Sequence, residues 1–143
     1  MPYVDIDQLI ERYGESELIQ LTDREASGFI EHEVLNRAIA DAVAEIDSYL
    51  SARYVVPVTP APPVLALHAA NITRYRLYED DTTEEVERRY RDALSWLRDI
   101  RDGRQPLDGA VPLSNGAHGR AAGGDREMIF TDSLWAQTPG GST

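Results

Sequence analysis

A single apolar stripe runs through residues 31 to 53, and it limits the possible folds more than any other feature of this chain. Apolar residues recur there at steps of three and four, which is the period of an α-helix that buries one face. The opposite face is acidic. The segment therefore predicts a long amphipathic helix that packs on other elements. The stripe consists of Leu35, Ile39, Ala42, Val43, Ile46, Tyr49 and Leu50.

The chain before this helix contains a shorter helical segment. It is expected to begin at Asp5 or Asp7 and to end at Gly14, and the following ESELIQLTD can add another turn or two. Further on, Thr22 and Glu25 have the spacing of a capping box, which predicts the entry of the long helix.

Four prolines in YVVPVTPAPP interrupt the helical pattern, because proline removes a backbone donor and favours extended backbone before it. The last of them, Pro63, suits the first turn of a helix over about residues 63–79, which is apolar on more than one side. A second capping-box pattern at Thr82 predicts a final helix over about residues 83–102, which Gly103 ends.

These patterns predict an all-α fold, a small helical bundle of three to four helices with an extended, irregular C-terminal tail. We expect a helical domain over residues 1–103 and a tail over residues 104–143. From Gly103 onward lie eight of the ten glycines and three of the eight prolines, and such a segment cannot bury enough surface to order itself. We expect partner chains to order it through its apolar clusters. The clusters are Met128, Ile129, Phe130, Leu134 and Trp135.

The charge of the chain argues against nucleic-acid binding. The formal net charge is −11 and lysine is absent, and residues 1–53 hold 12 acidic residues against 4 arginines. Binding to nucleic acid without sequence preference needs lysine and arginine arrayed against phosphates. An acidic surface would instead repel DNA. The acidic face of the long helix consists of Glu33, Asp41, Glu45 and Asp47.

Cysteine is absent, which excludes disulfides, thiolate metal sites and cysteine nucleophiles. No stretch approaches the roughly 18 apolar residues of a membrane span, and the start MPYVDIDQL lacks the pattern of a signal peptide. We therefore expect a soluble protein, made in the cytoplasm, with no membrane partner.

Residues 23–34, DREASGFIEHEV, look like the loop of a calcium-binding EF-hand, with glycine at the sixth place. Such a loop needs oxygen ligands at its first, third, fifth and twelfth places, the last a bidentate glutamate. Asp23, Glu25 and Ser27 fill the first three places, but the twelfth is Val34. The three residues form a weak candidate metal site. A calcium-responsive helical binding module is therefore the alternative function, beside the plainer interpretation of a helix entry.

Residues for catalysis do not form a recognisable pattern. Nucleophilic catalysis needs a hydroxyl beside a histidine and an orienting acid, and the histidines His32, His68 and His118 lie in unrelated contexts. Phosphate-binding loops and two-histidine metal spacing are also missing from the sequence. We expect no enzyme and no cofactor. Trp96 lies off the apolar stripe of its helix, so we expect it in a partner interface.

Three sequence blocks, in their order, are similar to a known family. DIDQLIERYGESELIQLTDR is followed by AIADAVAEIDSYLSARYVVPV and then by ITRYRLYEDDTTEEVERRYRDALSWL. This order resembles the Mu-like prophage family of phage proteins and, more distantly, the small helical head–tail connector (head-completion adaptor) proteins of tailed bacteriophages. The resemblance spans roughly residues 3–103, and its core is EIDSYLSARY, the proline-rich link and RYRLY.

The resemblance implies a structural virion protein in the neck, at the head–tail interface, assembled in the host cytoplasm. Such a chain would form a homo-oligomeric ring of about twelve copies below the portal protein and join the capsid to the tail. Its other partner would be a tail-side connector or terminator protein. DNA would pass through the ring without specific binding, with the acidic face of the 31–53 helix toward the lumen.

Overall fold

The stripe over residues 31–53 forms helix α3, His32–Leu50, in the computed structural model, which describes residues 2–114. The other helices are α1 (Ile6–Tyr13), α2 (Glu15–Thr22), α4 (Pro63–Leu77) and α5 (Glu84–Arg101). All five elements in the described part are α-helices, which confirms the predicted all-α class. None of these helices has both the length and the hydropathy that a bilayer span requires. The stripe residues that are buried on α3 are Leu35, Ile39, Ala42, Ile46 and Leu50.

The first predicted segment is two helices rather than one helix with extra turns. Asp5 caps α1, since its side chain accepts a hydrogen bond from the backbone N–H of Gln8 and the Gln8 side chain accepts from the Asp5 N–H. Gly14 joins the two helices with a φ of 89°, a region that glycine occupies without strain. The chain therefore turns at Gly14, and α2 begins directly after it.

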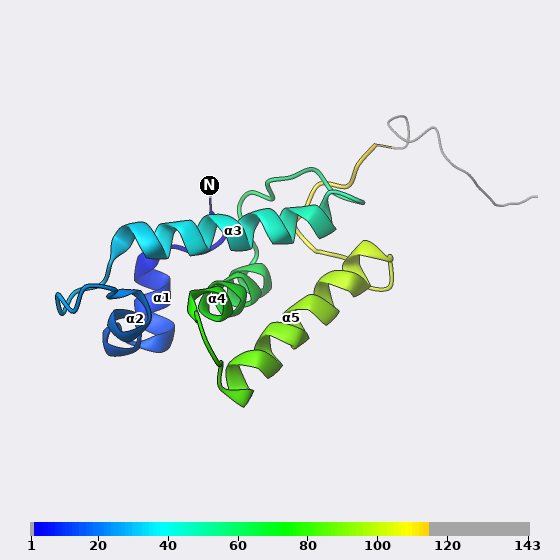
Figure 1. Ribbon diagram of the computed structural model, residues 1–143. Coiled ribbons are helices and arrows are strands. Elements are labelled where there is room, and N and C mark those ends of the chain that lie inside the picture. Colours follow the sequence, from blue (N-terminus) through cyan, green and yellow to red (C-terminus); the bar gives the residue numbers. More distant parts are fainter. Residues whose placement is uncertain (1, 115–143) are drawn as a thin grey trace, which may run out of the picture. The chain divides into compact units, whose positions relative to one another are not determined.

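Helix α4 lies in the middle of the fold, between α3 and α5 (Figure 1), and makes most of its contacts with these two helices. A helix covered by neighbours on several sides can be apolar all round. This explains why its apolar residues follow no single stripe. The buried residues of α4 are Leu65, Ala66, Ala69, Ala70, Asn71, Ile72, Thr73 and Leu77.

Two predicted capping boxes are wrong. Thr22 is the last residue of α2, and its hydroxyl donates to the Leu18 carbonyl and accepts from the Glu31 N–H, so it fastens the end of one helix to the start of the next. The cap of α5 is Thr83, one residue after the predicted Thr82, and its hydroxyl accepts from the Val86 N–H. The glutamate three residues after Thr82 made Thr82 the expected cap, whereas the structure uses its neighbour Thr83.

The compact helical unit extends past the predicted boundary at Gly103 and ends at Val111. Leu107 is buried in the core, and its N–H donates to the Tyr54 hydroxyl at 2.9 Å. The Val55 N–H donates to the Val111 carbonyl at 2.8 Å. The chain after α5 therefore returns to pack beside the segment that follows α3.

Several predicted residues lie outside the described range of 2–114. They are His118, Met128, Ile129, Phe130, Leu134 and Trp135. The contacts with partner chains that are predicted for the last five of these residues stay predictions.

Candidate interaction surface

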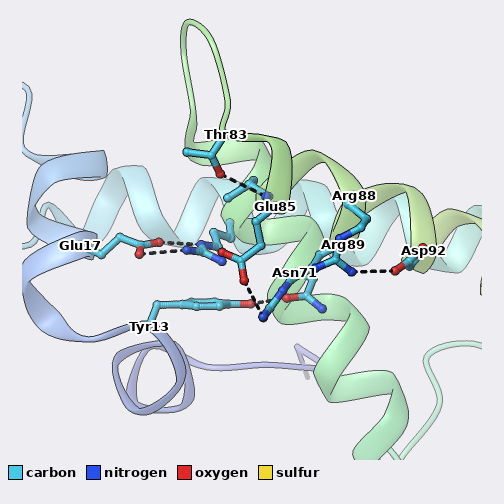
Figure 2. Close-up of polar contacts among 10 residues, drawn as sticks. Tyr13, Glu17, Asn71, Thr83, Glu85, Arg88, Arg89 and Asp92 are labelled. Atoms are coloured by element: carbon cyan, nitrogen blue, oxygen red, sulfur yellow. Dashed lines mark hydrogen bonds and ion pairs between the residues drawn. The ribbon is translucent and has the colours of Figure 1, made fainter.

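Side-chain bonds fasten the α1–α2 hairpin to α4 (Figure 2). The Tyr13 hydroxyl donates to Asn71 Oδ1 at 2.7 Å. Arg74 donates from Nε and Nη2 to the two carboxylate oxygens of Glu17, at 2.6 and 3.0 Å, and its guanidinium lies 4.6 Å from the centre of the Tyr13 ring. A paired, two-point contact of this kind fixes orientation as well as distance. The hairpin thus covers the C-terminal half of one face of α4.

Breaking the Glu17–Arg74 pair is expected to destabilise the protein. The two side chains are only 26% and 13% exposed, so Glu17→Gln removes charge-assisted bonds from a partly dry site. We expect a loss of about 1–3 kcal/mol in the free energy of unfolding, measured by urea denaturation. Glu87→Gln is the matched control, because the Glu87–Arg91 pair is exposed and should contribute at most about 0.5 kcal/mol. Equal losses in the two variants would contradict this interpretation of the hairpin contact.

Glu45 ties α3 to both α4 and α5. Its carboxylate accepts from Arg76 Nη2 at 2.8 Å and from the Tyr90 hydroxyl at 2.9 Å. Tyr90 also stacks in parallel on Tyr75, with ring centres 3.8 Å apart. Glu45 therefore has a role within its own subunit.

The four acids predicted to face a lumen do not share one open face. Glu33 and Asp41 are exposed, whereas Glu45 and Asp47 are half-buried. Asp47 accepts a hydrogen bond from the Tyr3 hydroxyl, which joins the N-terminal segment to α3. The acidic character of α3 was readable from the sequence, but its internal partners Tyr3, Arg76 and Tyr90 come from distant segments. The predicted direction of these acids toward DNA stays a prediction.

Three tyrosines in these contacts keep their protons to high pH. Burial, with a smaller effect from the hydrogen bonds to Asp47 and Glu45, raises the pKa of Tyr3 and Tyr90 to about 12, and burial raises the pKa of Tyr13 to about 12. An unfolded tyrosine loses its proton near pH 10.

Stability should therefore fall as the pH rises from about 10 to about 12, because the unfolded chain then binds fewer protons than the folded one. The chain has seven tyrosines, and an ultraviolet titration of the folded protein should show Tyr3, Tyr13 and Tyr90 ionising at a higher pH than free tyrosine. In the denatured protein this difference in pH should disappear. Tyr13→Phe should remove one late phenol. Simultaneous ionisation of all seven tyrosines near pH 10 in the folded protein would contradict the expected burial.

In the EF-hand-like loop, the carboxylate of Asp23 binds backbone N–H groups of the loop itself. One carboxylate oxygen accepts from the Ser27 N–H at 2.8 Å and the other from the Gly28 N–H at 2.7 Å. These backbone bonds, that of Gly28 first, lower the pKa of Asp23. No cluster of three acidic or histidine side chains able to hold a metal occurs between residues 2 and 114. Two of the three candidate ligands, Asp23 and Ser27, are thus hydrogen-bonded to each other within a turn. The third candidate is Glu25.

The same loop presents Phe29 to solvent, with 73% of its surface exposed. A large aromatic side chain in this position is a candidate contact for another chain. The polar residues around Phe29 make it stand out in the sequence, whereas the similarity to a calcium loop points only to the oxygen-bearing side chains of residues 23–34.

A second exposed apolar area lies at the N-terminal half of α4. Val64 and Leu67 are each 39% exposed, and His68 stacks on Trp96 with ring centres 4.5 Å apart. Burial lowers the pKa of His68, although nearby Asp92 acts in the opposite direction. Its Nδ1 is buried without a hydrogen-bond partner among the described residues. We name Val64, Leu67, His68 and Trp96 the α4 patch.

Catalytic geometry is missing from the described part of the chain. His32 is exposed at the start of α3, and neither His32 nor His68 makes a hydrogen bond to a hydroxyl within residues 2–114. The third histidine, His118, lies outside this range. The features that the structure does present are apolar side chains on the surface of a well-packed helical unit.

Comparison with known proteins assigns the chain to a family. The family model described as "Bacteriophage Mu, Gp36" matches residues 3–122. The chain belongs to this family. The Mu Gp36 family model covers the five helices of the described residues 2–114 and the return to Val111.

Two curated relatives agree with the Mu Gp36 family assignment. "Gene product J" of Escherichia phage Mu is 37% identical over 105 residues, which cover 73% of this chain and 74% of the relative. "Mu-like prophage FluMu protein gp36" of Haemophilus influenzae is 32% identical over 126 residues, which cover 85% of this chain and 89% of the relative. The predicted resemblance to Mu-like prophage proteins is thereby confirmed, and this Mu Gp36 family member is a bacteriophage protein.

Proposed function

We propose that this chain is a structural protein of the virion neck. It forms a ring of about twelve copies below the portal protein, joins the capsid to the tail, and has no enzymatic activity. Membership in a family of phage Mu proteins supports a role in the phage particle. Two kinds of partner complete the junction in this proposal, the portal on one side and a tail-side connector or terminator protein on the other.

The observation that carries the proposal is the presence of exposed apolar side chains at both ends of α3. Phe29 precedes the helix, while Val55 and Val111 lie together beyond its other end, 47% and 62% exposed. The 19 residues of α3 separate the two ends by about 28 Å. Two unlike contact areas on one subunit are what a head-to-tail ring needs, because each copy offers one area to the next copy and receives the other.

The charge of the chain fits a channel through which DNA passes. A net charge of −11 without any lysine gives no array of cations for phosphate groups. Glu33 and Asp41 are the exposed acids of α3 that remain available to repel DNA. DNA therefore moves through the ring in this proposal without specific binding.

A nonsense codon early in the gene tests the proposal. Induced cells should accumulate filled heads and complete tails that are not joined, and the intact chain supplied from a plasmid should restore joined, infectious particles. A Phe29→Asp chain should fail to restore them, because a charge would enter an apolar contact. Glu25→Gln, in the same loop, is the matched control and should restore them fully. Normal numbers of joined particles without the chain would contradict a neck function.

A further inference from the structure

One face of α4 is covered over only half of its length. Val64, His68, Asn71 and Tyr75 follow one another at steps of three and four, so they lie along the same side of the helix. In the C-terminal half, Tyr13 binds Asn71, and Tyr90 stacks on Tyr75.

The N-terminal half of this face has no such cover from the hairpin. There, Val64 and its neighbour Leu67 are each 39% exposed, and the Trp96 ring of α5 stacks on His68. Burial lowers the pKa of His68 and so favours the neutral imidazole, although Asp92 acts in the opposite direction, and the other three side chains of the patch are apolar. The area therefore suits a short apolar segment rather than a charged ligand.

We propose that the α4 patch of each copy binds residues 128–135 of a neighbouring copy. This segment, MIFTDSLW, holds five large apolar residues within eight positions, in a stretch otherwise rich in glycine and polar residues. Large aromatic and aliphatic anchors of this kind carry most of the free energy of short-segment binding. The inference rests on the proposed ring, because the ring is what supplies the neighbouring copy.

The connecting chain is long enough for its apolar segment to reach the patch of a neighbouring copy. Val111 bonds to Val55, and Val64 follows nine positions later, so the chain's own patch lies at most about 30 Å from Val111. Met128 follows Val111 by seventeen positions, which span up to about 55–60 Å when extended. The extended connection can therefore span well beyond the copy's own patch, and the proposed ring places the patch of an adjacent copy within its reach.

A binding assay tests the contact on the full chain. The receiver carries Phe130→Asp and Trp135→Asp, which disable its own segment, and the probe is a fluorescent synthetic peptide of residues 125–138. Fluorescence anisotropy should show saturable binding, and Val64→Asp in the receiver should weaken it at least about tenfold, because a charge without a partner would be buried.

Val64→Asp is compatible with the fold, since an acid in the first turn of a helix is favourable. Leu67→Arg is a second variant for the same purpose, and circular dichroism confirms that each receiver is folded. Ala44→Asp, at an exposed position of α3, adds the same charge elsewhere, so it is the matched control and should leave the affinity unchanged. Absence of saturable binding, or equal effects of Val64→Asp and Ala44→Asp, would overturn the assignment of the patch.

The absence of cysteine allows a second measurement that identifies which copy supplies the segment. A Leu67→Cys chain mixed with an Ile129→Cys chain should form a disulfide-linked pair on oxidation, and a chain carrying both substitutions should link copy to copy. If the double variant only closes on itself, as a faster-migrating monomer, the segment binds its own subunit and the proposal is wrong. The anisotropy and disulfide measurements test only the binding of the segment to the α4 patch, whereas the nonsense-codon experiment tests only the function in the neck. Either proposal can therefore be contradicted while the other is supported.

Discussion

A chain that stops after Ser114 should fold normally and yet produce no joined particles. The helical unit is complete at Val111, because Leu107 fills the core and the Val55–Val111 bond closes the chain on itself. Thermal melting should therefore remain cooperative, with a midpoint within a few degrees of that of the full chain. Assembly should be lost, because the apolar residues of segment 128–135 are removed.

Complementation of the nonsense mutant measures this second effect. The truncated chain should leave heads and tails apart, as counted by electron microscopy, although the protein is present at normal amounts. Ser133→Ala in the full chain is the control, since it keeps every apolar residue of the segment and should restore infectivity. Infectious particles with the truncated chain would show that residues 115–143 are dispensable for the junction.

Ile72→Ala should cause a large loss of stability. Ile72 is fully buried in the central helix and belongs to the core, so its truncation leaves a cavity there. Losses of about 2–5 kcal/mol follow such changes in packed cores, which is a large part of the stability of a domain of this size.

Val64→Ala provides the comparison on the same helix. Val64 is 39% exposed, and its truncation should lower the free energy of unfolding by no more than about 1 kcal/mol. Urea denaturation should thus give a much larger loss in the free energy of unfolding for Ile72→Ala, on the packed side of α4, than for Val64→Ala, on its exposed side. Similar losses in both variants would mean that Val64 is covered within the isolated chain, which would remove the basis for the α4 patch.

The helices could be predicted because each carries local signals of its own. The stripe of α3, Pro63 at the start of α4 and Gly14 between α1 and α2 act through backbone geometry and burial within a few residues. One error occurred where two neighbouring residues offered the same chemistry. Thr82 and Thr83 both suit a helix cap, and the structure uses Thr83, although Glu85 gives the capping-box spacing to Thr82.

The contacts between helices could not be predicted, since they join residues far apart in the chain. Glu45 looked like a solvated acid on α3, but it accepts bonds from Arg76 and Tyr90, which arrive from α4 and α5. Trp96 lies off the apolar stripe of its helix, but it packs against the core, and its stacking on His68 depends on how α4 and α5 cross. Such pairings are fixed by tertiary packing, which a single sequence does not specify.

Imaging of the assembled phage particle at side-chain resolution tests the proposed function most directly. We expect a ring of this chain between the portal and the first tail proteins, with Phe29 of each copy in contact with another chain and Glu33 and Asp41 toward the DNA. A particle in which the chain is absent from the neck, or lies there as isolated copies that do not touch one another, would contradict the proposed adaptor ring.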